Sequence, residues 1–183
     1  TGLLAFDGKV SRVFQLQRGR ESSLHILNML ERIAVSDNKS KGTALRPALE
    51  TAAKLLRQRA LVIILSDFKV EHFEKELGLL ARRHDVAAIR ITAPYDEALP
   101  AAGILRFSDP ETGIERLLPT NSHQLRQNRI RRITEDIQQW ESSCIRCGAY
   151  PLVVPYDGTT VKLLNKFFLT GKYGIQPTNR YRR

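Results

Sequence analysis

The chain has 183 residues, of which 42% are hydrophobic, so its length and composition indicate one globular domain rather than a disordered segment. Its formal net charge of +10 comes from 29 basic and 19 acidic residues, and it favours anionic partners such as nucleic acid, acidic lipid or an acidic protein face. Two cysteines provide no disulfide framework, no apolar run is long enough to cross a bilayer, and the chain does not open with a signal peptide. We therefore expect a soluble, cytoplasmic protein.

The first part of the chain predicts a β-hairpin followed by two helices. Residues 1–7 form an apolar strand, Asp7-Gly8 is a turn signal, and Val10–Gln17 alternates as a second, less buried strand. Glu21–Ala34 and Ala44–Arg57 carry apolar residues three or four positions apart, which is the pattern of helices that bury one face. The predicted buried faces consist of Leu24, Leu27, Leu30 and Ala34 in the first helix and Leu45, Leu49, Ala52 and Leu56 in the second.

The stretch Leu61–Phe68 organises the second part of the chain. Its branched aliphatic residues predict a strand that is buried on both faces, in the middle of a parallel sheet. Asp67 then lies at the carboxyl end of the sheet, where open α/β sheets bind their ligands. The alternative is that Ser66 and Asp67 begin the turn into the next helix, because both residue types favour turns and helix caps.

Helices and strands alternate through the rest of the chain. In chain order we expect a helix over Val70–Arg83, a strand over Asp85–Thr92, a small hairpin from Gly103–Phe107 to Ile114–Leu118, a long helix over Ser122–Cys147, a strand over Leu152–Val154 and a helix over Thr160–Leu169. This alternation predicts an α/β fold with a doubly wound, mostly parallel sheet flanked by helices. We expect one domain over residues 1–170 and a loose basic tail over residues 171–183.

Several motifs are candidates for chemical sites. Cys144 and Cys147 form a C-x-x-C at the end of the long helix, where packing in the core is the main interpretation and a metal or redox pair the alternative. The sequence contains no Gly-rich phosphate loop and no G-x-S-x-G elbow, so a hydrolase or nucleotide enzyme has no support. Arginines crowd the first half of the long helix and indicate either a solvated face or nucleic-acid binding. They are Arg126, Arg129, Arg131 and Arg132.

Thr43 and Asp67 remain as candidate oxygen ligands. Each lies beside a helix, at what the predicted topology makes the same edge of the sheet. One hydroxyl and one carboxylate suit a hard cation such as Mg²⁺, although a third ligand must come from elsewhere. Thr43 could instead serve as the N-cap of the second helix.

Five short motifs follow one another in a recognisable order. They are Gly42-Thr43-Ala44-Leu45, Leu61–Phe68, Arg83-His84-Asp85-Val86, Leu99-Pro100-x-x-Gly103 and Asp109-x-Glu111-Thr112-Gly113. This series resembles the bacterial domain-of-unknown-function family fifty-eight, which has a von Willebrand factor A-like domain. The resemblance extends from about Thr1 to Leu169.

The resemblance implies a Rossmann-like sheet with a metal-ion-dependent adhesion site. That site combines an upstream D-x-S-x-S, a threonine and an aspartate, and Thr43 and Asp67 match the last two positions. Because the D-x-S-x-S does not occur, we expect the N-terminal strand of the fold to be missing and the sheet to be poorly closed unless a partner fills the gap. A second departure is Ala93-Pro94-Tyr95-Asp96, where family members often have Asp-Pro-x-Glu, so that the acidic role there falls to Asp96 with Glu97 beside it.

The function implied by the resemblance is a non-enzymatic protein-interaction module. Family members are often encoded near MoxR-type AAA+ ATPases, so the implied role is that of an adaptor whose acidic partner completes a Mg²⁺ shell. Two alternatives stay open, a basic nucleic-acid-binding domain and a structural domain with a vestigial metal site. Membrane attachment through the missing N-terminal part is also left open.

Overall fold

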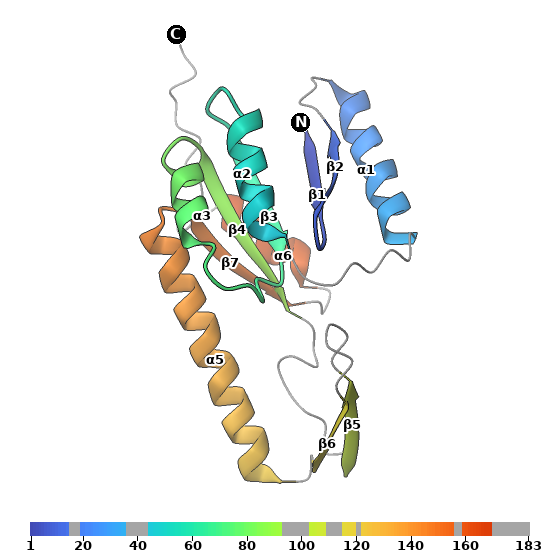
Figure 1. Cartoon of the computed structure of the whole chain (residues 1–183), viewed down its shortest axis with the longest axis vertical. Helices are drawn as coiled ribbons and strands as arrows, with labels where there is room; N and C mark the ends of the chain where they lie inside the picture. The colour runs from blue at the N-terminus through green and yellow to red at the C-terminus, as the bar shows by residue number, and fades with distance from the viewer. Residues whose placement is uncertain are drawn as a thin grey trace. The chain divides into compact units, whose positions relative to one another are not determined.

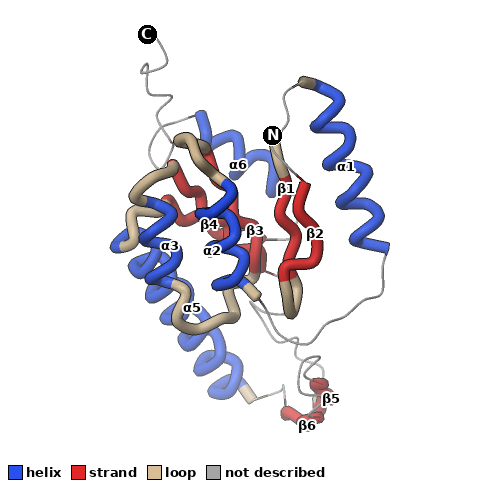
Figure 2. Tube along the Cα trace, turned by 45° about the horizontal axis from the view of Figure 1, so that its top comes forward, coloured by secondary structure: helices blue, strands red, loops and turns tan. Residues whose placement is uncertain are grey.

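The computed structural model describes residues 1–14, 19–35, 44–92, 103–108, 115–119, 122–155 and 159–169, and Figures 1 and 2 show their helices and strands. The chain forms two compact units. The first consists of residues 1–57 and 69–76, and the second of residues 58–68 and 77–183. The second unit contains the parallel sheet and Asp67.

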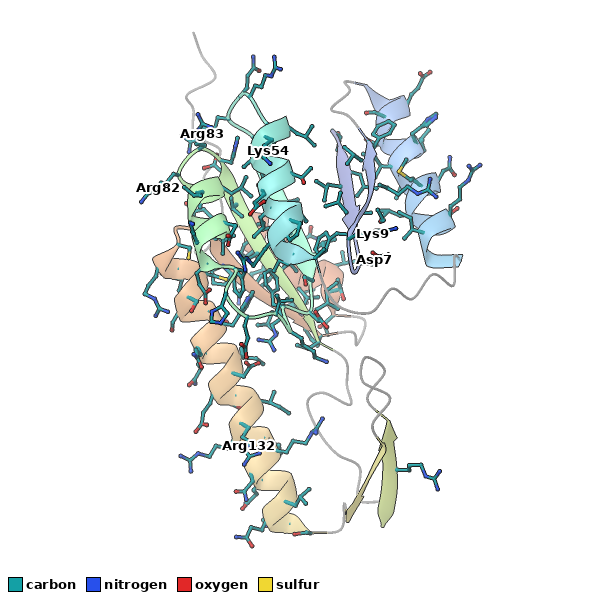
Figure 3. The ribbon with its side chains drawn as sticks, viewed as in Figure 1. Asp7, Lys9, Lys54, Arg82, Arg83 and Arg132 are labelled. Carbon is teal, nitrogen blue, oxygen red and sulfur yellow. The ribbon has the colours of Figure 1, made fainter. Side chains whose placement is uncertain are left out.

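The first unit begins with the predicted hairpin. Strands β1 (Leu3–Phe6) and β2 (Val10–Phe14) pair antiparallel, with Leu3 opposite Phe14. The turn is held by two hydrogen bonds of 3.0 Å, from the Asp7 N–H to the Lys9 carbonyl and from the Lys9 N–H to the Asp7 carboxylate. Both residues lie at the tip of the hairpin in Figure 3. The turn signal in the sequence is therefore confirmed.

Two helices complete the first unit, and only one of them buries its predicted face. Helix α2 (Leu45–Leu55) buries Leu45 and Leu49 and packs against β1. Helix α1 (Arg20–Val35) forms as predicted, but its apolar side chains at Leu24, Leu27 and Leu30 are exposed. The expectation of a buried face on α1 is thus wrong, because helical periodicity gives the direction of an apolar stripe but not whether another element covers it.

The second unit is built on a parallel sheet with the order β3-β4-β7. Its strands are β3 (Leu61–Ser66), β4 (Asp85–Thr92) and β7 (Tyr150–Pro155), and helices α5 (His123–Arg146) and α6 (Thr160–Leu169) pack against β7 (Figure 1). A separate antiparallel hairpin is formed by β5 (Ile104–Ser108) and β6 (Glu115–Pro119), as predicted. The expected Rossmann-like α/β architecture is confirmed.

The positions of β3 and β4 in the sheet differ from the prediction. β4 lies in the middle and buries Val86, Ala87, Ala88 and Ile89. In the described part of the chain β3 pairs with β4 alone, so one of its edges is open. One of its faces is open as well, because Ile63 is 48% exposed whereas Ile64 is 6% exposed. The expectation of a strand buried on both faces is therefore wrong for β3, because an apolar run predicts a strand but does not determine its neighbours.

The helices around the sheet mostly follow their local signals. Helix α3 (Glu74–Ala81) starts later than the predicted Val70, because His72 has φ +61°, which a right-handed helix excludes. The N-cap of α5 is Ser122, whose hydroxyl accepts a hydrogen bond from the Leu125 N–H at 3.3 Å. After α5 the chain turns at Gly148, with φ +83°. No helix in the described ranges combines the length and the apolar character needed to cross a bilayer.

Candidate functional site

Asp67 follows the last residue of β3, at the carboxyl end of the parallel sheet, and its side chain is exposed. The hydroxyl of Ser66 accepts a hydrogen bond from the Phe68 N–H at 3.1 Å, which closes a tight turn around Asp67. Ser66 thus has the turn role that the sequence left open, while Asp67 is exposed. The position predicted for Asp67 is the one observed.

Phe68 holds this turn in an unusual conformation. Its φ of +52° lies in the left-handed region, where an aromatic residue is strained by roughly 1–3 kcal/mol. The ring of Phe68 is buried and packs on Trp140 of α5, with 5.0 Å between ring centroids and 52° between ring planes. Because burial of the aromatic ring offsets the backbone strain, the turn at Asp67 depends on a contact with helix α5.

A buried arginine lies on the strand next to this turn. Arg90 of β4 is paired in register with Ser66 of β3 and is 7% exposed. Its guanidinium donates a hydrogen bond to Asp136 of α5 at 2.5 Å, and its central carbon lies 5.7 Å from the centroid of the Trp140 ring. A buried cation needs such a carboxylate, because an unpaired charge in the interior is strongly destabilising.

Sequence reasoning missed this group of residues. Trp140 falls within the predicted helix Ser122–Cys147 and Arg90 within the predicted strand Asp85–Thr92, and no motif marks either residue as part of a site. The available signal was a charged residue inside the otherwise apolar segment Asp85–Thr92, which demands a partner elsewhere in the fold.

The second predicted ligand, Thr43, lies outside the described residues, so its proximity to Asp67 stays a prediction. Asp96 and Glu97 lie outside them as well. The N-cap residue of α2 is Ala44 rather than Thr43, and the Ala44 N–H donates to the Asp7 carbonyl at 2.5 Å. The alternative role of Thr43 as N-cap is therefore wrong.

The described residues include one of the two predicted metal ligands, Asp67. An exposed aspartate suits Mg²⁺ in kind. Within the described ranges, however, no three His, Cys, Asp or Glu side chains come together as a set of ligands. Cys144 is fully buried and Cys147 partly buried, and neither forms a disulfide bond, in keeping with their interpretation as packing residues.

The arginines of α5 do not form one open basic stripe. Arg131 donates a hydrogen bond to Glu135 at 2.7 Å, and this bond raises the pKa of the Arg131 guanidinium. Arg129 is half-buried and Arg132, labelled in Figure 3, is exposed. Side-chain placement at Arg126 lies outside the description. Internal pairing of this kind favours a solvated helix face over a groove that tracks phosphates.

His84 is a buried titratable group at the opposite end of β4 from Asp67. It precedes the first residue of the strand, and neither ring nitrogen has a hydrogen-bond partner among the described residues. Burial, together with the charge of Arg83, lowers the pKa of the His84 imidazole below its ordinary value. The neutral form is therefore favoured, and His84 is a structural residue rather than part of the site at Asp67.

Residues 1–139 match the family described as "Protein of unknown function DUF58". An uncharacterized protein of Mycobacterium avium is 28% identical over 131 residues, which cover 71% of this chain and 77% of the relative. An uncharacterized protein of Mycobacterium tuberculosis is 30% identical over 118 residues, which cover 63% of this chain but only 36% of that relative. Among solved structures, the conserved hypothetical protein BatB from Bacteroides thetaiotaomicron has a TM-score of 0.48 at 14% identity, over 90% of this chain and 75% of BatB.

Proposed function

The chain belongs to the DUF58 family, and from this premise we propose that it is a non-enzymatic protein-interaction module in which Asp67 contacts the partner. The observation that carries the proposal is the placement of Asp67. Its carboxylate is exposed at the carboxyl end of a parallel sheet, in a turn that Ser66 and Phe68 fix from both sides. An exposed residue on a defined backbone turn can bind with little loss of backbone entropy, which suits recognition.

The surface next to Asp67 supports a protein as the partner. β3 exposes an apolar row that consists of Leu61, Ile63 and Leu65. In the described part of the chain its outer edge also has no strand partner. Apolar side chains beside an open strand edge are typical of surfaces that another polypeptide covers.

Asp67, with Thr43 and further oxygen ligands, would hold Mg²⁺ in the proposed site. When bound, the ion would supply a positive charge, and an acidic side chain of the partner could complete its coordination shell. By resemblance to the family, we propose a MoxR-type AAA+ ATPase as the partner and the cytoplasm as the location. The chain itself contributes the rigid turn and the carboxylate.

The test is binding between this protein and a MoxR-type ATPase from the same organism, measured by biolayer interferometry with Mg²⁺ or with EDTA. We expect Asp67→Ala to weaken Mg²⁺-dependent binding by about tenfold or more, since loss of a ligand should cost at least as much as loss of a residue that supports one. Glu71→Ala removes another exposed carboxylate nearby in the sequence and should leave binding unchanged. Equal affinity of the wild type and Asp67→Ala would contradict the proposal.

A further inference from the structure

We propose that Phe68, Arg90, Asp136 and Trp140, here called the Arg90 cluster, position the Asp67 carboxylate and couple it to helix α5. The inference rests on the proposed function of Asp67 as the contact residue. It assigns positioning roles to four residues that do not themselves meet the partner. It also implies that a change at Asp136, the exposed member of the cluster, affects the Asp67 turn.

The contacts of the cluster form a continuous series that begins and ends at Ser66, next to Asp67. Ser66 is next to Arg90 in the register of β3 and β4. Arg90 contacts both Asp136 and Trp140, which lie one turn apart on the same face of α5. Trp140 packs on Phe68, and the Phe68 N–H returns to the hydroxyl of Ser66. This last hydrogen bond joins the residues on either side of Asp67.

Packing fixes the position of the Trp140 ring. The indole N–H is buried and has no hydrogen-bond partner among the described residues, so the contacts with Phe68 and Arg90 hold the ring. The ring in turn holds Phe68 at a positive φ that an aromatic residue seldom adopts. If the ring moves, the turn loses the contact that offsets its strain.

Packing alone does not explain an arginine at position 90. An apolar residue of similar size would fill the space between β4 and α5 without the cost of burying a charge. The guanidinium instead reaches Asp136, whose side chain is 62% exposed. The ion pair therefore connects the buried side of the Asp67 turn with the surface of α5. Loss of the charge at Asp136 should therefore shift Arg90 and Trp140 and, through them, alter the turn at Asp67.

The first test measures the turn without any metal or partner. Asp136→Asn keeps the shape of the side chain but removes its charge, and Glu135→Gln is the matched control on the same helix, where it breaks only the exposed pair with Arg131. Hydrogen exchange of the Phe68 amide, measured by NMR, reports directly on its bond to Ser66. We expect exchange to rise about fivefold or more in Asp136→Asn and to stay unchanged in Glu135→Gln.

Two further measurements separate positioning from a general loss of stability. Trp140 is the only tryptophan of the sequence, so its fluorescence emission reports on the cluster. We expect a red shift of this emission in Asp136→Asn but not in the control Glu135→Gln. Phe68→Leu keeps an apolar side chain but removes the aromatic contact, and it should speed exchange of the residue 68 amide as well. Unchanged exchange in both Asp136→Asn and Phe68→Leu would overturn the inference.

The second test links the cluster to binding and keeps the two proposals apart. In the full-length protein, Asp136→Asn should weaken Asp67-dependent binding of the MoxR-type ATPase severalfold, and Glu135→Gln should not. Faster Phe68 exchange with unchanged binding would overturn the positioning role. If Asp67→Ala binds like the wild type while Phe68 exchange still responds to Asp136→Asn, the proposed function fails and the link between α5 and the turn stands.

Discussion

Ile63 and Ile64 provide a direct test of the open face of β3. They are neighbours on one strand, share the same chemistry and point to opposite faces of the sheet. Ile64 is 6% exposed, whereas Ile63 is 48% exposed. Replacing each in turn by alanine therefore compares the two faces at one place in the fold.

The structure predicts unequal costs for the two substitutions. Ile64→Ala removes a buried side chain and leaves a cavity, so the free energy of unfolding should fall by about 2–5 kcal/mol. Ile63 has only about half of its side chain out of water, so the full transfer term of about 1.5–3 kcal/mol is roughly halved, to about 1 kcal/mol. No closed cavity forms at Ile63, because that side of the strand is open.

The assay is urea unfolding of the 183-residue chain, followed by far-UV circular dichroism. The midpoint should shift strongly for Ile64→Ala and little for Ile63→Ala, with the same slope for both. Equal shifts would refute the argument, because they would mean that the outer face of β3 is covered as well as the inner one.

Two further predictions concern pH and backbone geometry. Burial and Arg83 lower the pKa of His84 in the folded chain, whereas Asp85 opposes this shift, so the unfolded chain takes up the proton first. The melting temperature should therefore fall as the pH drops below about 6.5 toward the lower folded pKa, and His84→Gln should flatten that part of the profile. Gly148→Ala should cost about 1–2 kcal/mol, because φ is +83° while the added methyl meets only Ala81 at 3.7 Å. The control Gly78→Ala lies in α3, where the added methyl would only touch Cys147 at 4.0 Å, and it should be neutral or stabilising by up to about 1 kcal/mol. Equal effects of the two changes on urea unfolding would contradict the role of φ.

Local signals in the sequence were sufficient for many elements. The Asp7-Gly8 turn, strand Asp85–Thr92 and helix Thr160–Leu169 have the bounds or geometry that were expected. Ser122 and Gly148 delimit α5 through cap chemistry, which depends only on nearby residues. The carboxyl-end position of Asp67 followed from the same reasoning, because it needs only a strand and its direction.

Other features depend on distant parts of the chain and were not predictable in this way. The apolar stripe of α1 and the open face of β3 look like buried surfaces in the sequence, since periodicity does not identify the covering element. The Arg90–Asp136 pair joins residues 46 positions apart, which no local pattern reveals. The left-handed φ of Phe68 is likewise held by a tertiary contact with Trp140.

The measurement that tests the central claim most directly is a Mg²⁺ titration of the full-length natural protein followed by thermal melting, with Asp67→Ala beside the wild type. Mg²⁺ at a hundredfold excess over its dissociation constant should add about 2.7 kcal/mol to the unfolding free energy, and so raise the melting temperature by several degrees. The account predicts this rise in the wild type and its loss in Asp67→Ala. A rise of the same size in both proteins, or none in either, would contradict the assignment of Asp67 to the binding site.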